Sequence, residues 1–254
     1  MNSILLFIVI VILGFLAAFS DTSLGMGYSL LTPILMLIGY QAIVVVPILL
    51  LAQMCIGFTG TIFHHLYGNI DLSSKEKDVK ITILFSLTGM TGMLIAVIVA
   101  INVPAIVLSI YIGAILFAAG ILMMVKLKFE FTWAKLYVLS ALGAFNKAMS
   151  GGGYGPITTS GQIMSDRKVK KSIAVTSFSE AFLSGFGFLL YFIFNNFQLV
   201  EVQLMIIMVI SGVIATPLGA LLAKKLNKKR ARIVIGFASI SLGIITVIRL
   251  FIVL

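Results

Sequence analysis

The sequence Gly25-Met26-Gly27-Tyr28 interrupts one long apolar run of this chain, and Gly151-Gly152-Gly153-Tyr154 interrupts another. Glycine inside a helix costs roughly 0.5–1 kcal/mol relative to alanine, so both runs are expected to break there. The two stretches lie 126 residues apart in a chain of 254. Laid on each other, they match in two glycines, the tyrosine and a threonine four residues after the tyrosine. An offset of about half the chain indicates a duplicated unit.

The composition is that of an integral membrane protein. Hydrophobic residues make up 61% of the chain and charged residues only 10%, whereas soluble domains carry about 25% charged residues. Apolar runs reach about 20 residues, which is the length that a helix needs to cross a bilayer, and strand-like alternation is absent. The sequence therefore predicts an all-α integral membrane protein.

Several other classes of protein are disfavoured. Cys55 is the single cysteine, which excludes an internal disulfide and a cysteine-rich metal or iron–sulfur site. His64 and His65 are adjacent, so they face different directions on a helix and are poor joint metal ligands. The net charge of +10 is confined to short loops, so nucleic acid is not an expected partner. No HExxH, GxxxxGK[ST] or GxSxG motif is present, and we expect neither an enzyme nor a cofactor.

Each half is predicted to contain one broken helical hairpin followed by three transmembrane helices. In the first half, residues 1–125, these are the hairpin 4–38 and the spans 43–66, 81–101 and 105–125. In the second half, residues 126–254, they are the hairpin 136–164 and the spans 173–194, 202–223 and 233–254. The arms are short for two full spans, so we expect each tip to lie within the membrane, where broken backbone must be buried or line a wet cavity. Re-entrant and fully spanning arms both remain open.

The basic residues predict how the chain is oriented. All Lys and Arg except Lys147 and Arg249 lie in the four segments 71–80, 126–135, 165–171 and 224–232. Such segments mark the cytoplasmic side, so both termini of this multi-pass protein of the cell membrane are predicted to lie outside. The two halves are then upside down relative to each other. This inverted-topology repeat is common in secondary transporters, whose substrate site lies at the repeat interface. The alternative is that the glycines only allow helices to pack closely.

Two acidic residues, Asp21 and Glu180, lie within the predicted membrane segments. An ionisable group at that depth costs about 2.5–3.5 kcal/mol or more unless it is paired or hydrated, so each is a functional candidate. Glu180 could carry a proton across the membrane, or it could form a permanent ion pair. Gln53 occupies nearly the equivalent place in the first half; its amide could bind substrate oxygens but cannot carry a proton.

Lys147 is the one lysine inside an apolar arm, and it aligns with Asp21 of the first half. It could attract an anion, or it could pair with a carboxylate and serve assembly only. The glycine breaks are expected to leave unpaired backbone N–H groups at helix starts, where an anion can bind. The tyrosines that follow could add hydroxyl donors or could serve packing. The predicted substrate-binding residues are Gly25, Gly27, Tyr28, Gln53, Lys147, Gly151, Gly152, Gly153 and Tyr154, with Glu180 for proton coupling and Asp21, Asn146 and His64 as secondary candidates.

The two half-chain motifs resemble those of a known family of membrane proteins. They read Ser20-Asp21-Thr22-Ser23-Leu24-Gly25-Met26-Gly27-Tyr28 with Thr32-Pro33, and Ser150-Gly151-Gly152-Gly153-Tyr154-Gly155-Pro156 with Thr158-Thr159. Together with the segment from His64 to Asn69 and the pair Ser179-Glu180, they are similar to the sulfite exporter TauE/SafE family, also called the 4-toluene sulfonate uptake permease family. The first motif departs from the triple glycine, with Met26 in its middle.

The resemblance implies a small bacterial permease for a sulfur-containing anion such as sulfite, thiosulfate, sulfoacetate or another sulfonate. We expect a transporter that is coupled to protons, with a small anion, the lipid bilayer and protons as its partners. A passive anion channel and an accessory membrane subunit remain as alternatives. The direction of transport, the stoichiometry and the oligomeric state, which includes a homodimer among the options, are left open by the sequence.

Overall fold

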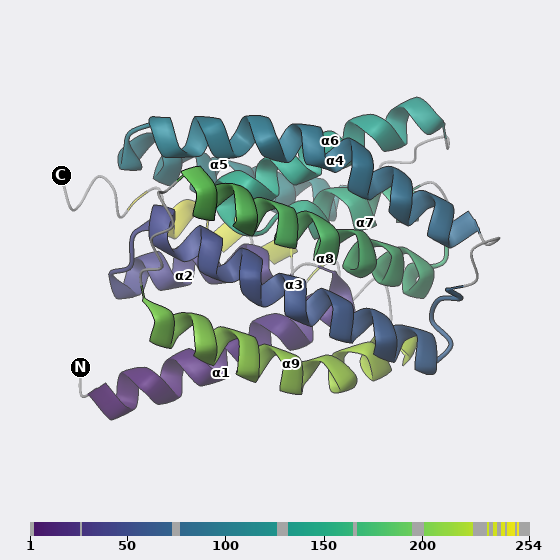
Figure 1. Ribbon diagram of the computed structural model, residues 1–254, viewed down its shortest axis with the longest axis horizontal. Coiled ribbons are helices and arrows are strands. Elements are labelled where there is room, and N and C mark those ends of the chain that lie inside the picture. The colour runs from purple at the N-terminus through teal and green to yellow at the C-terminus, as the bar shows by residue number, and fades with distance from the viewer. Residues whose placement is uncertain are drawn as a thin grey trace.

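The computed structural model describes residues 3–25, 27–72, 77–125, 132–164, 167–194 and 201–225, together with positions 233, 236–237, 240–241, 243–246 and 248. These residues form helices and turns, with no strand among them (Figure 1). The protein is therefore an all-α membrane protein, as the composition predicted. Met26 and most of the predicted span 233–254 lie outside the described residues.

The described segments contain the following helices. They are α1 (Ser3–Leu24), α2 (Tyr28–Ile38), α3 (Ala42–Leu66), α4 (Lys77–Asn102), α5 (Ala105–Met124), α6 (Trp133–Ser150), α7 (Tyr154–Met164), α8 (Val169–Phe194) and α9 (Val202–Lys225). Five of them, α1, α3, α4, α8 and α9, are long and apolar enough to cross a membrane, whereas α2 is a shorter apolar helix. Each hairpin thus joins a longer helix to a helix of 11 residues.

Some helices begin about one turn earlier than the sequence predicted, among them α6, which begins at Trp133 and not at residue 136. α4 begins at Lys77 and α8 at Val169, whereas the predicted spans began at residues 81 and 173. Their first turns carry Lys and Asp residues, which a search for apolar runs leaves out. A helix can continue beyond the hydrocarbon because its backbone hydrogen bonds do not depend on apolar side chains.

Left-handed glycines end α1 and α6 at the two breaks. Gly25 has a φ of +77° and Gly151 a φ of +72°, which residues with a Cβ rarely adopt. The Gly25 N–H donates to the Asp21 carbonyl at 2.6 Å, and the Gly151 N–H donates to the Lys147 carbonyl at 2.8 Å. This is the αL type of helix end. Each break therefore has a charged residue one turn before it.

The two breaks lie against each other inside the bundle. A Cβ added at Gly152 would lie 2.5 Å from the backbone of Ser29, and one added at Gly25 would lie 2.7 Å from Thr159 Oγ1. The Gly153 N–H donates to Ser29 Oγ at 2.8 Å. The glycines are thus required for close approach between the hairpins as well as for the turns.

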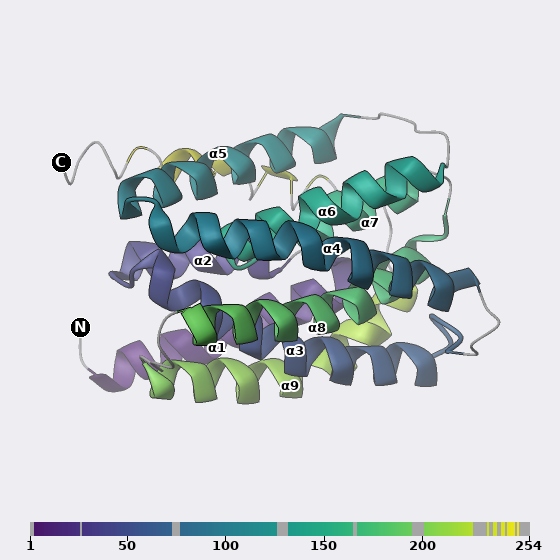
Figure 2. The same ribbon diagram turned by 45° about the horizontal axis from the view of Figure 1, so that its top comes forward.

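Helices of the first half pair with helices of the second half. α1 runs beside α9, α4 beside α6 and α3 beside α8 (Figures 1 and 2). α1 and α6 hold corresponding places in the two halves, as do α9 and α4. Two glycines allow these contacts, because Gly92 of α4 meets the backbone of Ala141 and Gly219 of α9 meets the backbone of Phe19. The two halves therefore share one core.

One end of the bundle holds the described parts of the basic segments. Asp78 at the start of α4 forms ion pairs with Lys171, at 2.8 Å, and with Arg167. Lys170 Nζ donates to the Gly68 carbonyl at 3.0 Å. The opposite end holds the start of α1 and the connections 39–41 and 103–104 (Figure 2). The described connections thus alternate between two ends as the positions of Lys and Arg led us to expect.

Substituting Gly152 with Ala is expected to destabilise the contact between the breaks. The new Cβ would meet the Ser29 backbone, which cannot rotate away, so we expect a loss of about 1–3 kcal/mol. Thermal unfolding of the purified protein in detergent should show a midpoint lowered by roughly 3–10 °C. Gly185→Ala in α8 is the matched control, because its Cβ would meet only the flexible side chain of Met54. Equal midpoints for the two variants would contradict this account of the contact.

Cysteine labelling tests which end faces the cytoplasm. In a Cys55→Ala background, Lys168→Cys and Gln41→Cys each place one thiol at an exposed position, at opposite ends of the bundle. A maleimide that does not cross membranes should label Gln41→Cys in intact cells and Lys168→Cys only after permeabilisation, because basic segments stay in the cytoplasm. The reverse pattern would place both termini inside.

Candidate functional site

Lys147, in the last turn of α6, is the centre of a buried charged cluster. Its Nζ donates to Glu180 Oε1 of α8 at 2.7 Å and to Gln53 Oε1 of α3. The side chains of Lys147 and Glu180 are 0% and 4% exposed. Burying one charge alone costs several kcal/mol, so each of these two groups depends on the other. The cluster joins three helices, one from the first half and two from the second.

Asp21 brings a second carboxyl to this cluster. It lies in the last turn of α1, and its Oδ1 accepts from the Tyr28 N–H at 3.4 Å. The Gly27 N–H faces the same carboxyl, which also interacts electrostatically with Lys147 and Glu180. Asp21 retains some exposed surface, whereas Glu180 is 3% exposed. The site therefore holds two carboxyls and one ammonium group.

The charged residues occupy matching places in the two halves. Asp21 and Lys147 lie one turn before their breaks, 126 residues apart. Gln53 and Glu180 lie 127 residues apart in α3 and α8, whose starts are separated by the same 127 residues. The two pairs differ in charge, so the halves are alike in backbone and different in chemistry.

Several buried polar groups of the first half have no hydrogen-bond partner within the described part of the chain. Gln53 Nε2 is one of them, because the amide oxygen must face the Lys147 ammonium and the amide nitrogen then points away. The hydroxyl of Tyr28 is another; it lies near Gly212 of α9. Thr32 Oγ1 is adjacent to the second break, where a Cβ on Gly151 would be 2.8 Å away. Leaving such groups unpaired costs about 1–3 kcal/mol each, so they are positions where a ligand would be stabilised.

The corresponding groups of the second half have partners. Tyr154 OH is 3.1 Å from Ser179 Oγ, and Thr158 Oγ1 donates to the Tyr154 carbonyl at 2.7 Å. Ser179 lies 127 residues after Ala52, which has no hydroxyl to offer Tyr28. Ser140 is a second hydrogen-bonding neighbour of the Tyr154 side chain, and Gly14, 126 residues before it, has no hydroxyl either. The three unpartnered groups named above thus all belong to the first half.

The backbone amides of the breaks are not free, contrary to our expectation from the sequence. In addition to Gly25 and Gly151, which close their own helices, Gly153 donates to Ser29 Oγ and Gly152 donates to Ser150 Oγ at 3.4 Å. The sequence could not show this, because the acceptor of Gly153 comes from the other half of the chain. Side chains rather than these glycine amides are the available donors.

Two secondary candidates lie outside the charged cluster. Asn146 Oδ1 accepts from Tyr111 OH at 3.2 Å, and its amide nitrogen packs against Gly153. His64 is 11 residues after Gln53 on α3, which is about three helical turns. Its Nδ1 lies 3.0 Å from Asn69 Nδ2. Among the described residues, no three His, Cys, Asp or Glu side chains are grouped so that they could hold a metal ion.

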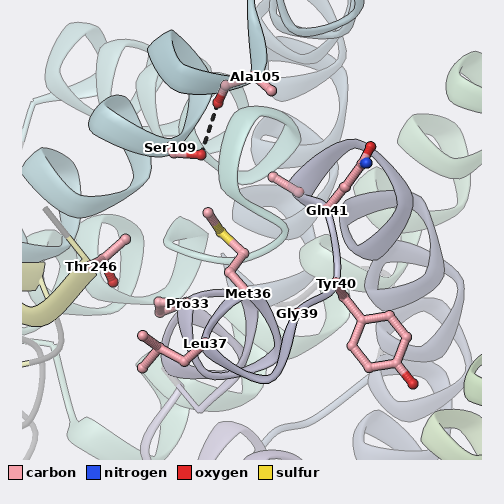
Figure 3. A pocket seen from close by; sticks show the side chains of 10 residues that line it. Pro33, Met36, Leu37, Gly39, Tyr40, Gln41, Ala105, Ser109 and Thr246 are labelled. Atoms are coloured by element: carbon pink, nitrogen blue, oxygen red, sulfur yellow. Dashed lines mark hydrogen bonds between the residues drawn. The ribbon is translucent and has the colours of Figure 1, made fainter. Parts of the chain in front are cut away.

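A pocket of about 220 Å³ lies at the end of the bundle opposite the basic segments (Figure 3). It is formed by the end of α2, the start of α3, α5 and Thr246, and its lining residues are Pro33, Met36, Leu37, Gly39, Tyr40, Gln41, Ala42, Ala105, Ser109 and Thr246. None of the residues predicted to bind substrate lines it. α2 thus contacts the charged cluster at its amino end and this pocket at its carboxyl end.

Sequence reasoning missed some members of the site. Thr32, Ser29 and Ser179 were not predicted to bind or to position anything. The match between Thr32 and Thr158 in the aligned motifs was the available signal. The match does not reveal the role of Thr32, because that role depends on which residues lie near Thr32 in the folded chain.

Comparisons with known proteins agree with this architecture. The family model described as Sulfite exporter TauE/SafE matches residues 10–246. The chain is also similar to a Bacillus subtilis (strain 168) protein named Probable membrane transporter protein YtnM, with 26% identity over 245 residues that cover 90% of this chain and 78% of the relative. No solved structure matches the chain. Because the family match spans nearly all of the two-break bundle, this protein belongs to the sulfite exporter TauE/SafE family.

Proposed function

We propose that the protein is a secondary transporter for a small sulfur-containing anion, which binds where the two helix breaks meet. The observation that carries this proposal is the group of unpartnered polar atoms, Tyr28 OH, Gln53 Nε2 and Thr32 Oγ1, on the first-half side of the buried Lys147 ion pair. Membership in the family and the name of the relative support a membrane transporter.

The available groups suit the oxygens of a sulfur oxyanion. Hydroxyl and amide N–H groups donate hydrogen bonds to such oxygens without bringing a full charge. Lys147 supplies a positive charge in a medium of low dielectric, where its effect on an anion is stronger than in water. Sulfite, thiosulfate, sulfoacetate and other sulfonates all present about three oxygens on one sulfur atom to hydrogen-bond donors.

We propose alternating access between the two halves as the transport cycle. The halves form an inverted repeat, with both termini outside, and the site lies where their breaks touch. The contact of Gly152 with Ser29 and that of Gly25 with Thr159 would change when one half rocks against the other. α2, which extends from the charged cluster to the pocket opposite the basic end, is the element that could connect substrate binding with opening of that end.

Proton coupling is the finer part of the proposal. The sequence suggested Glu180 as the coupling residue, because it is a carboxyl inside a span. In the structure this carboxyl is bound to Lys147. Coupling through Glu180 would therefore require this ion pair to break when Glu180 takes up a proton, so the carboxyl that binds the proton has to be tested separately.

Other functions predict different behaviour. A passive anion channel would give flux that does not saturate and does not respond to a pH gradient. An accessory subunit would give no flux and would purify with a partner.

Uptake into proteoliposomes tests the proposal. Sulfite, thiosulfate, a sulfonate and an organic carboxylate are compared with and without a pH gradient, with protein-free vesicles as the control. Saturable uptake of one sulfur anion supports the proposal. If none of the anions is taken up, although a thermal unfolding transition shows that the protein is folded, the proposal is overturned.

Substituting Tyr28 with Phe should weaken substrate binding without loss of stability. The hydroxyl has no hydrogen-bond partner to lose among the described residues, and a hydrogen bond to an anion contributes about 1.5–3 kcal/mol, so the apparent KM should rise by about tenfold or more. The melting midpoint should stay near that of the wild type. In the matched variant Tyr154→Phe, loss of the Ser179 contact should lower the midpoint and leave KM nearly unchanged. The proposed site is wrong if Tyr28→Phe binds substrate as the wild type does.

A further inference from the structure

The charged cluster holds one more carboxyl than it has ammonium groups. Glu180 accepts directly from Lys147, whereas no ion pair of Asp21 is among the described contacts. Asp21 interacts with Lys147 only through space, and Glu180 repels it. If all three groups are ionised, the buried cluster carries one net negative charge, which disfavours a bound anion.

Asp21 occupies the position where an anion would otherwise bind. Its carboxyl lies at the amino end of α2, facing the Gly27 and Tyr28 N–H groups. Helix starts favour negative charge because the peptide dipoles and free N–H groups point there. The unpartnered Tyr28 OH, on a side chain with 0% exposure, belongs to the first residue of the same helix and lies within electrostatic reach of Asp21. The ionised Asp21 and a substrate anion would therefore compete for the same positive end.

We propose that Asp21 is the residue that binds the coupled proton, and that its protonation frees the amino end of α2 for the substrate anion. This inference rests on the proposed function. The proton enters from solvent on the loading side, binds the Asp21 carboxylate and leaves to solvent on the other side, so one proton crosses with each substrate that binds. No bond of the substrate changes.

Asp21 suits this role better than Glu180 for two reasons. Asp21 keeps more exposed surface than Glu180, which is 3% exposed. A proton on Glu180 would leave the buried Lys147 ammonium without its ionic partner. A proton on Asp21 instead leaves a neutral cluster, in which the Lys147 and Glu180 charges balance.

The groups around Asp21 come from every helix packed against α1. α6 provides Lys147, α8 provides Glu180 and α2 provides Tyr28. α3 provides Cys55, which interacts with Tyr28, and His64, which faces the Thr22 backbone. α9 presents Gly219 near this turn, and its own titratable residues are Lys224 and Lys225 in its last turn. Of these groups, Lys147 is the cation that interacts electrostatically with Asp21.

The test compares Asp21→Asn with Glu180→Gln in proteoliposomes that contain a transported sulfur anion. For one proton per anion, a gradient of one pH unit should drive about tenfold accumulation by the wild type, because one pH unit is a tenfold ratio of proton activity. With Asp21→Asn, the anion concentrations inside and outside the vesicles should become equal, a ratio of about 1. Saturable exchange of the anion across the vesicle membrane should remain. A dye for internal pH should report proton entry with the anion for the wild type and none for Asp21→Asn.

Glu180→Gln is the variant that separates the two assignments. We expect it to lose thermal stability, because Lys147 loses its partner, and any exchange that remains should still accumulate anion in response to the gradient. Accumulation by Asp21→Asn equal to that of the wild type would overturn the inference. If Asp21→Asn does not fold, Asp21→Glu replaces it: the pH at half-maximal uptake should shift by about half a unit or more, and an unchanged value would overturn the inference. Absence of transport by the wild type would instead refute the proposed function.

Discussion

A charged side chain in the middle of an apolar bundle must be paired, and the pairing of Lys147 with Glu180 meets this constraint. Because Lys147 also donates to Gln53, these two contacts hold α3, α6 and α8 in one arrangement. The break after α6 follows Lys147 by one turn, so the same interaction fixes where the second hairpin turns. The first hairpin is then placed by the contact of its break with the second. The position of the candidate site thus depends on one buried ion pair.

The two halves carry different polar groups at positions that correspond in the sequence. In the second half, Ser179 lies within hydrogen-bond distance of the Tyr154 hydroxyl and the threonines that follow are hydrogen-bonded, so these groups have partners within their own half. In the first half, Ala52 stands in the place that corresponds to Ser179, and Tyr28 keeps an unpaired hydroxyl. Duplication followed by divergence of a few residues can thus convert one copy into a scaffold and leave the other to meet a ligand. The opposite charges of Asp21 and Lys147 extend this difference to electrostatics.

Much of the fold could be predicted because the signals are local. Glycine adopts positive φ values more easily than other residues, and Gly25 and Gly151 have such values. A glycine cluster in an apolar run therefore indicates a break before any contact is known. The helices between the loops follow from runs of apolar residues. The early starts of α4 and α8 were missed, because charged residues in a first turn are compatible with a helix and give no apolar signal. The membership of Lys147, Glu180 and Gln53 in one site could be suspected from their depth in the spans.

The sequence by itself determined that the chain forms a membrane bundle of helices with two breaks at corresponding places, because composition and glycine conformation act through neighbouring residues. Only the tertiary structure decided which polar groups are paired. Gly153 finds its acceptor 124 residues away on Ser29, and Lys147 finds Gln53 94 residues away, and no local pattern encodes such partners. The distinction between the tyrosine that is hydrogen-bonded and the one that is free therefore arises on folding, since a hydrogen bond requires two atoms to meet in space.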